Sequence, residues 1–525
     1  MARHRVLNPV LLLEPIFSAD LIVGCEDFRF SPLKQRIPPI GKAKKMSKFN
    51  TLTATPPVSR RTTTNLAGGD AFEMSSKAEL ASILLTSFVQ DGYYRSADDT
   101  LTRLFELLDE VPARFAAQAA VYARNEFGMR SISHVVAAEL AYRVRGEQWT
   151  KHFISAVVRR PDDITEILAY YFSKYGNKAP KALLRGLGMA FDKFDAYQLA
   201  KYRAEGKAVS LVDAVNLTHP HPTAKNAEAL KLLVNDSLRN SNTWETKLSK
   251  AGGDENAKEN AWRELLSERK IGYFALLRNL RNISQQAPDL IPAAAEMLVD
   301  PKLIHKSLVL PFRYLTALQE VSEPTLISAL SKALDVSLDN VPNFDNSLIA
   351  IDHSGSMDSP ATGNTLSRHY IGDIFAAALF KKNHSDVMVF GDSAGYVVGL
   401  NPDDSTLTIA EQIGSVNYGH GTNFQAIFEL PSKSYNRFVI FSDMQAWVNG
   451  GWGYSHPGEA RADYEKRTGA QPNVFSFDLA GHGSLQFPAN KTFQIAGFSE
   501  KALPLMEKLE TDPQAMVHAI EAVKF

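Results

Sequence analysis

The hydrophobic period changes once along this chain, near Asn343, and that change limits the folds open to it. From Ser75 to about Val336, apolar residues recur at helical spacing in segments of about 10–15 residues separated by short joints. After Asn343, short apolar runs at 348–351, 387–390 and 438–441 alternate with helical patterns. Because buried strands that alternate with helices form parallel sheets, the 525 residues predict a multidomain protein, a helical part followed by an α/β part.

The helical part has the character of an α-solenoid. Helix pairs that repeat every ~40 residues are typical of HEAT-like arrays, and we place this domain at 62–340 and the α/β domain at 341–525. Residues 1–61 carry seven prolines and 11 basic against 4 acidic residues, so we predict a disordered basic tail. The polar stretch 241–260 is predicted to be a surface loop.

The net charge of −1 conceals two opposed parts. Residues 343–525 hold 12 Lys and Arg against 20 Asp and Glu, whereas 114–203 hold 15 against 8. A row of basic side chains on one side of a helical array suits phosphate groups, and ordinary solvated surface is the alternative for each residue. The candidates for such phosphate contacts are Arg124, Arg130, Lys181, Arg185, Lys201 and Arg203, and composition alone does not establish that they bind a nucleic acid.

Cysteine content and hydropathy bear on the compartment. The single cysteine, Cys25, excludes an intrachain disulfide framework and a Cys-rich zinc module, and it favours a cytoplasmic location. The apolar stretch near the start resembles a secretion signal, but Pro9, Glu14 and Asp20 interrupt it. No apolar run reaches ~18 residues, so we expect no membrane partner.

Three loops that follow predicted strands carry oxygen ligands. The first strand ends in the pattern D-x-S-x-S, a Gly-His-Gly-Thr turn precedes a helix expected to start near Asn423, and a later strand ends in Ser-Asp. The carboxyl ends of parallel strands meet at one edge of the sheet, where sites form. Carboxylates and hydroxyls suit a small hard cation, so we predict a divalent ion, Mg²⁺ foremost. The candidate metal ligands are Asp352, Ser354, Ser356, Thr422 and Asp443.

Other interpretations of these loops stay open. Asp and Ser are common in turns and at helix N-caps, which would account for D-x-S-x-S without a metal. With few carboxylates bound, the ion would stay electrophilic and could accept the carboxylate of an acidic protein ligand. Trp447, Trp452 and Tyr454 follow Asp443 and form either a partner-contact patch or ordinary packing. His353 and His420 have no identifiable triad partner.

The site and sheet resemble a von Willebrand factor A domain with a metal-ion-dependent adhesion site (MIDAS). A helical array ahead of such a domain makes the chain similar to the Ro autoantigen family, whose helical part is the TROVE module. The resemblance covers about 46–525, and its further motifs are Asp91-Gly92-Tyr93-Tyr94-Arg95, Tyr202-Arg203, Ala275-Leu276-Leu277-Arg278-Asn279-Leu280 after Trp262, Pro311-Phe312-Arg313-Tyr314 and the stretch 456–466.

The resemblance implies a ring of HEAT-like helices closed by the A domain, without enzymatic activity. Family members bind small non-coding Y RNAs on the basic outer surface and single-stranded 3′ ends of misfolded RNAs in the hole. Bacterial relatives act in RNA quality control, maturation and decay with exoribonucleases such as polynucleotide phosphorylase. One departure concerns a family helix that directs His and Arg toward Y RNA, because this chain has Leu211 and Asn216 there. The Y RNA contacts are therefore left undefined.

Two other functions compete with RNA binding. A metal-dependent protein-interaction module would use the divalent ion and need no RNA. A magnesium phosphohydrolase would need a carboxylate nucleophile or base beside the ion. The D-x-S-x-S pattern supplies hydroxyls there, and Asp358 is the one nearby carboxylate in the sequence that is not a predicted metal ligand. We therefore expect a non-enzymatic protein that binds RNA rather than DNA.

Overall fold

The structure, a computed structural model, describes residues 63–65, 70–71, 75–86, 97–203, 206–238, 248, 251–252, 254–307, 309, 311–360, 366–445, 457–480, 486–487, 491–496, 502–512 and 514–525. The predicted tail 1–61, the motif Asp91–Arg95 and the aromatic patch Trp447, Trp452 and Tyr454 lie outside these residues.

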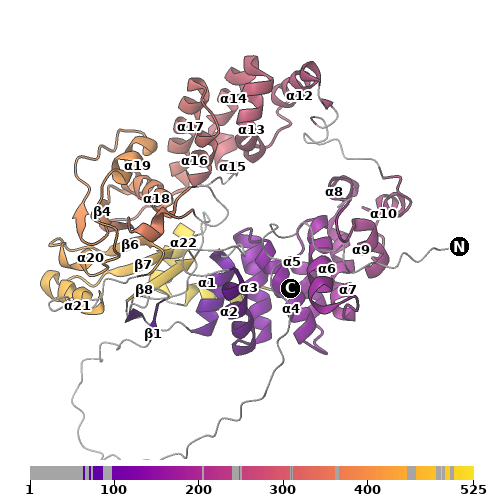
Figure 1. Ribbon diagram of the computed structural model, residues 1–525, viewed down its shortest axis with the longest axis horizontal. Coiled ribbons are helices and arrows are strands. Elements are labelled where there is room, and N and C mark those ends of the chain that lie inside the picture. The colour runs from indigo at the N-terminus through magenta and orange to yellow at the C-terminus, as the bar shows by residue number, and fades with distance from the viewer. Residues whose placement is uncertain are drawn as a thin grey trace, which may run out of the picture.

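The front of the chain is helical, as its apolar period predicts (Figure 1). A two-stranded antiparallel pair, β1 Thr63–Thr64 and β2 Asp70–Ala71, precedes the helices. In chain order the helices are α1 Ser76–Thr86, α2 Ala97–Glu110, α3 Ala113–Glu126, α4 Ser131–Arg143, α5 Thr150–Val157, α6 Pro161–Tyr175, α7 Lys181–Ala190, α8 Ala196–Lys201, α9 Leu211–Thr218, α10 Ala227–Val234, α12 Glu255–Ser267, α13 Tyr273–Gln286, α14 Ile291–Leu298, α15 Pro301–Ser307, α16 Pro311–Gln319 and α17 Pro324–Ser337.

The loop predicted at 241–260 is wrong in its last part, because α12 already begins at Glu255. Asp254 is its N-cap and accepts a hydrogen bond from the backbone N–H of Ala257 at 3.1 Å. This helix contains three Glu, two Ala and two Leu, which are good helix formers, so the polarity of its first turns marks an exposed helix rather than a loop.

The back of the chain is a six-stranded sheet with strand order β5-β4-β3-β6-β7-β8, in which β5 alone runs antiparallel to its neighbour. Its strands are β3 Ser347–Asp352, β4 Asp386–Phe390, β5 Ala394–Tyr396, β6 Arg437–Ser442, β7 Asn473–Asp478 and β8 Thr492–Ala496. The helices of this part are α18 Arg368–Asn383, α19 Thr406–Gly414, α20 Ala426–Glu429, α21 Pro457–Thr468, α22 Ala502–Thr511 and α23 Ala515–Glu521.

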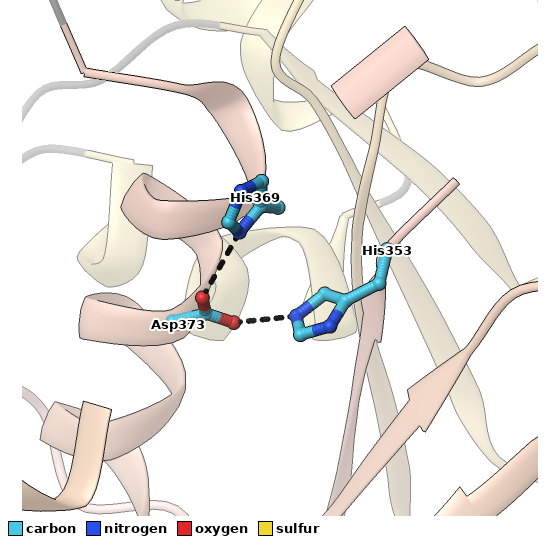
Figure 2. A group of neighbouring side chains, drawn as sticks. All are labelled: His353, His369 and Asp373. Carbon is cyan, nitrogen blue, oxygen red and sulfur yellow. Dashed lines mark hydrogen bonds and ion pairs between the residues drawn. The ribbon is translucent and has the colours of Figure 1, made fainter. Parts of the chain in front are cut away.

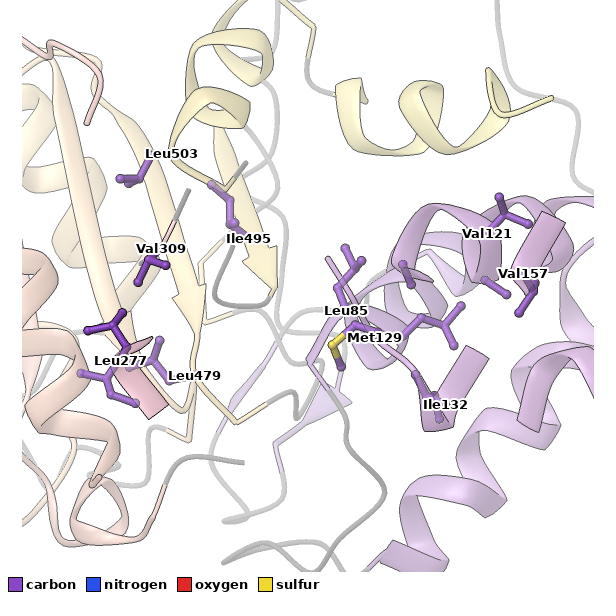
Figure 3. Close-up of a cluster of buried hydrophobic side chains, with 14 of the residues drawn as sticks. Leu85, Val121, Met129, Ile132, Val157, Leu277, Val309, Leu479, Ile495 and Leu503 are labelled. Carbon is purple, nitrogen blue, oxygen red and sulfur yellow. The ribbon is translucent and has the colours of Figure 1, made fainter. Parts of the chain in front are cut away.

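Both faces of the sheet are buried, which explains why its strands are almost continuously apolar. Along β3, Ile349 and Ile351 join the core that contains α18 and α22, whereas Leu348 and Ala350 join a second core with α20 and α21. The first core also includes buried side chains of the front helices. Figure 3 labels members from both parts, such as Leu85 and Met129 of the front and Leu479 and Ile495 of the α/β part.

The α/β part contacts the helical part near both ends of the helical series. At one end α1 packs against β8 and α3 against α23, and Gln118 donates hydrogen bonds to the carbonyls of Glu521 and Val523. At the other end α16 packs against α18 and α17 against α19, where Asp335 accepts a hydrogen bond from Thr406 N at 2.9 Å. The sheet domain therefore links the first and last helices of the series.

Candidate functional site

The five predicted metal ligands come together at one edge of the sheet. Asp352 ends β3 and Asp443 follows β6, and these two strands are neighbours from which the strand order continues in opposite directions. In such a sheet the switch point between strands leaves a crevice beyond their carboxyl ends. Among the five, the largest exposed fraction is the 4% of Ser356.

Hydrogen bonds hold the D-x-S-x-S loop in a defined shape. Asp352 Oδ1 accepts from the backbone N–H of Ser354 at 2.8 Å, and Oδ2 accepts from Ser442 Oγ at 2.6 Å. The hydroxyl oxygens of Ser354 and Ser356 lie 3.2 Å apart. Gly355 N donates to the carbonyl of His420 at 3.0 Å, which ties this loop to the one that carries Thr422.

The helix after Thr422 begins later than predicted. It is α20, which starts at Ala426 rather than near Asn423. The side chain of Asn423 accepts from the N–H groups of Gln425 and Ala426 instead, so 422–425 form a turn ahead of the helix.

Three buried side-chain oxygen atoms at this edge have no hydrogen-bond partner among the described residues. Thr422 Oγ1 and both carboxylate oxygens of Asp443 are buried without a hydrogen bond among the described residues. Burial and the nearby charge of Asp352 raise the pKa of Asp443 to about 7, although the Ser356 hydroxyl and Arg368, 3.9 Å away, oppose the rise. Burial also raises the pKa of Asp352. Buried carboxylates therefore outnumber the one cation that is recorded beside them, Arg368.

Three further residues complete the surroundings, and the sequence interpretation did not include them. Ser442 bonds Asp352, and Asp478, at the end of β7, lies in register with Ser442 and adds a third buried carboxylate. Arg368 opens α18 with an exposed fraction of 2% and donates to the carbonyl of Ser356 at 3.0 Å. Asp478 could have been found, since it ends an apolar strand as Asp352 does.

A second group of titratable side chains lies behind the loop (Figure 2). His353 Nε2 is 2.8 Å from Asp373 Oδ1, and His369 Nδ1 is 3.3 Å from Asp373 Oδ2. Burial opposes the charged form of His353, but the Asp373 carboxylate outweighs it and raises the pKa of His353. His353 thus has a carboxylate partner that its sequence neighbourhood did not reveal, because Asp373 lies on α18.

The structure separates the predicted RNA-binding residues into two kinds. Arg124 Nη2 lies 2.8 Å from Asp163, and Arg130 contacts both Asp163 and Glu166. Arg203 donates to Asp236 and to the carbonyl of Leu238 at 2.8 Å. These guanidinium groups are occupied by partners within the chain, and their contact with RNA stays a prediction.

Lys181 and Arg185 are different. Both are exposed on α7, and the structure records no ion pair or hydrogen bond for either side chain among the residues that it describes. Lys201 follows on α8 with its ammonium 5.6 Å from the ring centre of Tyr202. At i, i+4 spacing, Lys181 and Arg185 present two charges on one helix face.

A hollow of about 530 Å³ lies beside α5, and its lining is basic. Lys193 donates to the carbonyls of Ser155 and Val158, and burial together with the charge of Arg159 lowers the pKa of Lys193 to about 8. His152 and Phe525 also line this hollow. A second hollow of about 550 Å³, between α13 and α16, is lined by Phe274, Arg278, Arg281 and Arg313, among others.

In the part of the chain that the structure describes, no helix is long and apolar enough to cross a membrane.

Comparisons with known proteins assign the front of the chain to a protein family. The family model described as "TROVE domain" matches residues 44–237 and 235–340, more than half of the chain. "Telomerase protein component 1" of Mus musculus and of Rattus norvegicus are each 23% identical over 341 residues, which cover 47% of this chain and 13% of the relative. The chain thus spans only a small part of the length of these relatives.

Among solved structures, the chain is similar to the "Crystal structure of Deinococcus radiodurans RO (RSR) protein". The TM-score is 0.57 at 20% identity, and the match covers 85% of this chain and 99% of the other. At this identity the likeness shows a shared fold, a helix-rich front followed by a mixed α/β sheet.

Proposed function

The chain belongs to the TROVE-domain family, which includes the Ro proteins, and from this premise we propose that it is an RNA-binding protein. Its ligands would be small non-coding Y RNA and the single-stranded 3′ ends of misfolded or structured RNAs. The observation that carries the proposal is the exposed and unpaired Lys181 and Arg185 on α7, inside the matched residues. Phosphate groups supply the counter-charge that the chain itself does not provide there.

The physical basis is release of counterions and charge-assisted hydrogen bonding. An RNA backbone that neutralises Lys181 and Arg185 frees its condensed cations, so affinity falls as salt rises. A guanidinium such as Arg185 can hold a phosphate through two parallel N–H bonds, and an ammonium such as Lys181 acts as a point charge. The hollow with Lys193 and Arg159 supports a second phosphate position, because an anion there would relieve the repulsion between these two cations, which both line the hollow.

We further propose that the helices form a HEAT-like ring that the α/β domain closes. The contacts of α1 and α3 at one end, and of α16 and α17 at the other, with one α/β domain support this closure. A ring gives a hole that admits single-stranded RNA and excludes duplex, which suits the capture of 3′ ends. In this proposal the protein acts in the cytoplasm in RNA quality control, maturation or decay, and an exoribonuclease processes the RNA that it holds.

The α/β domain is proposed to be a von Willebrand factor A domain with a MIDAS. Asp352, Ser354, Ser356, Thr422 and Asp443 would hold a divalent cation, Mg²⁺ foremost, directly or through water. The fit rests on the oxygens of Thr422 and Asp443 that accept no recorded hydrogen bond among the described residues, and on three buried carboxylates beside one recorded cation, Arg368. When bound, the ion would supply an electrophilic position for a carboxylate from another protein.

A metal-dependent protein-interaction module without RNA is the second candidate function. It is favoured by the same unpaired oxygens, since they do not depend on α7. The two functions can be separated experimentally. Affinity for RNA should fall as the salt concentration rises, whereas binding of a protein ligand at the metal site should be lost when a chelator removes the ion.

The test is a binding titration with a fluorescent RNA that has a duplex stem and a 3′ single-stranded tail. We expect binding that weakens steeply between 50 and 200 mM salt, as for other complexes with several phosphate contacts (a loss of about 10³ or more for six or more contacts), and that persists in EDTA. Binding that ignores ionic strength, or that needs Mg²⁺, would contradict the RNA proposal and favour the second function.

A further inference from the structure

The group behind the D-x-S-x-S loop has the geometry of a second metal site. Among the described residues, it is the one group of three His, Cys, Asp or Glu side chains whose ligand atoms all lie within 4.8 Å of one another. His353 follows β3, whereas His369 and Asp373 lie one turn apart on α18. Figure 2 shows both imidazoles directed at the Asp373 carboxylate between them.

The remaining ring nitrogens are held by acceptors on the far side. His353 Nδ1 lies 2.8 Å from the carbonyl oxygen of Val416, so this nitrogen carries a proton and Nε2 faces Asp373. His369 Nε2 lies 3.5 Å from the Asp358 carboxylate, which leaves Nδ1 to face Asp373. Metal-binding histidines are oriented in this way, with the second ring N–H directed at a carbonyl or a carboxylate.

The buried charge of Asp373 is balanced either by a charged imidazole or by a metal ion in its place. Its exposed fraction is 0%, and its recorded ion pairs within the described residues are with His353 and His369. No Lys or Arg is recorded against it in that part of the chain. A buried carboxylate needs a proton, a charged imidazole or a metal ion beside it.

We propose that His353, His369 and Asp373 bind a transition-metal ion of the Zn²⁺ class at a site separate from the proposed Mg²⁺ site. Two imidazoles and a carboxylate are the ligand set of open zinc sites, while Mg²⁺ prefers oxygen alone. Tetrahedral ligands ~2.0–2.1 Å from zinc lie about 3.3 Å apart. The recorded separations are 2.8 Å from His353 Nε2 to Asp373 Oδ1 and 3.3 Å from His369 Nδ1 to Asp373 Oδ2, so each imidazole faces its own oxygen of the carboxylate that would ligate the ion. A water molecule would take the fourth position, since Asp358 contacts the opposite nitrogen of His369.

The site has an entry route and a structural consequence. The His369 side chain is 27% exposed and Asp358 is 67% exposed, so an ion reaches the group from solvent. His353 stands between Asp352 and Ser354 in the chain. A bound ion would therefore fasten the D-x-S-x-S loop to α18, and occupancy would stabilise the loop that holds the proposed Mg²⁺ ligands.

The test is calorimetric titration of metal-free full-length protein with Zn²⁺. We expect one site that excess Mg²⁺ does not displace, and with Co²⁺ the visible d–d absorption of a four-coordinate N/O site. The variants His369→Gln and Asp373→Asn should lose affinity by about 100-fold or more. Because His369 is partly exposed and Asp373 is wholly buried, His369→Gln is less disruptive to folding than Asp373→Asn. Circular dichroism checks that each variant is folded.

Two controls complete the design. His384→Asn removes an exposed histidine of the same domain at a left-handed position that Asn tolerates, and it should bind Zn²⁺ as the unmodified protein does. Asp352→Ala should lose Mg²⁺ and retain Zn²⁺. Equal Zn²⁺ affinity in His369→Gln and His384→Asn, or no binding to the unmodified protein, would overturn the proposal and leave a proton-linked cluster. Either result is independent of RNA binding.

Discussion

Asp163 Oδ2 accepts a hydrogen bond from Arg124 Nη2 at 2.8 Å, and this wholly buried carboxylate joins three helices of the front domain. Arg124 comes from α3 and Arg130 from the start of α4, while the backbone N–H groups of Arg159 and Arg160 donate to Asp163 ahead of α6. His134 of α4 lies 3.2 Å from Asp163 Oδ1. One carboxylate thus neutralises two of the cations from which the basic character of 114–203 arises.

Replacing Asp163 with Asn should lower the free energy of unfolding by about 3–5 kcal/mol at pH 7, because the Arg124 guanidinium, with a side chain only 9% exposed, loses its recorded counter-charge. Arg130 keeps Asp162 and Glu166 as partners. Although burial opposes ionisation, His134 and Arg124 hold the pKa of Asp163 far below its usual range. The stabilisation is therefore present above the unfolded pKa of about 3.9 and is lost as pH falls below it. Urea unfolding at pH 7 and pH 3.5 should show the difference between the two proteins shrinking at the lower pH.

The control for this prediction is Asp254→Asn, which keeps a good N-cap on α12 and should be near neutral at both pH values. A difference for Asp163→Asn that is the same at pH 7 and pH 3.5 would show that ionisation of Asp163 does not stabilise the fold.

Gly186 sets the distance between α5 and α7. A Cβ at this position would lie 2.6 Å from both Ile154 Cβ and the carbonyl oxygen of Lys151, so Gly186→Ala must push the helices apart. Helix propensity alone would stabilise the alanine variant by about 1 kcal/mol, whereas overpacking costs about 1–3 kcal/mol. We expect a net loss in thermal unfolding, together with weaker RNA binding because α7 carries Lys181 and Arg185.

Gly272→Ala is the matched control, since a Cβ there meets nothing within 4 Å. A Gly186→Ala protein as stable as Gly272→Ala would mean that α5 and α7 are not in close contact at this point.

Asp443→Asn tests the proposed Mg²⁺ site through stability. In EDTA the variant should be at least as stable as the parent, because it removes the repulsion between the buried carboxylates of Asp443 and Asp352, which Arg368 at 3.9 Å offsets only in part. With Mg²⁺ at 100 times its Kd, the parent should gain about 2.7 kcal/mol and the variant almost nothing. Thermal unfolding with and without Mg²⁺ measures both effects. An equal gain in stability on adding Mg²⁺ to the two proteins would show that Asp443 is not a ligand of the ion.

The change of apolar period predicted both halves of the fold. A helix that buries one face and a strand that is buried on both faces each require a characteristic spacing of apolar residues, which can be seen in the local sequence. The neighbouring positions of Asp352 and Asp443 could be predicted for a related reason, since parallel strands bring their carboxyl ends to one edge, whereas the joint role of the five predicted ligands stays a prediction. The ion-pair partners of individual charged side chains could not be predicted from the sequence. Arg124 and Asp163 are 39 positions apart and His353 and Asp373 are 20 apart, so their pairing depends on how helices pack.

The same limit explains why composition overstated the basic surface. Counting Lys and Arg cannot distinguish Arg124, which is buried against Asp163, from Arg185, which is exposed. The start of α12 shows the converse error, in which polar residues of an exposed helix look like a loop. Local pattern therefore predicts elements better than it predicts the environment of a side chain.

The central claim is that RNA binds through the exposed basic face of α7. Fluorescence anisotropy with a stem-and-tail RNA should compare Lys181→Ala/Arg185→Ala with Lys302→Ala/Lys332→Ala, which removes two exposed lysines from helices α15 and α17. We predict a loss of at least about tenfold in affinity for the first variant alone, and a salt slope shallower by about 1.5. Equal affinities and equal slopes for the two variants would contradict the claim.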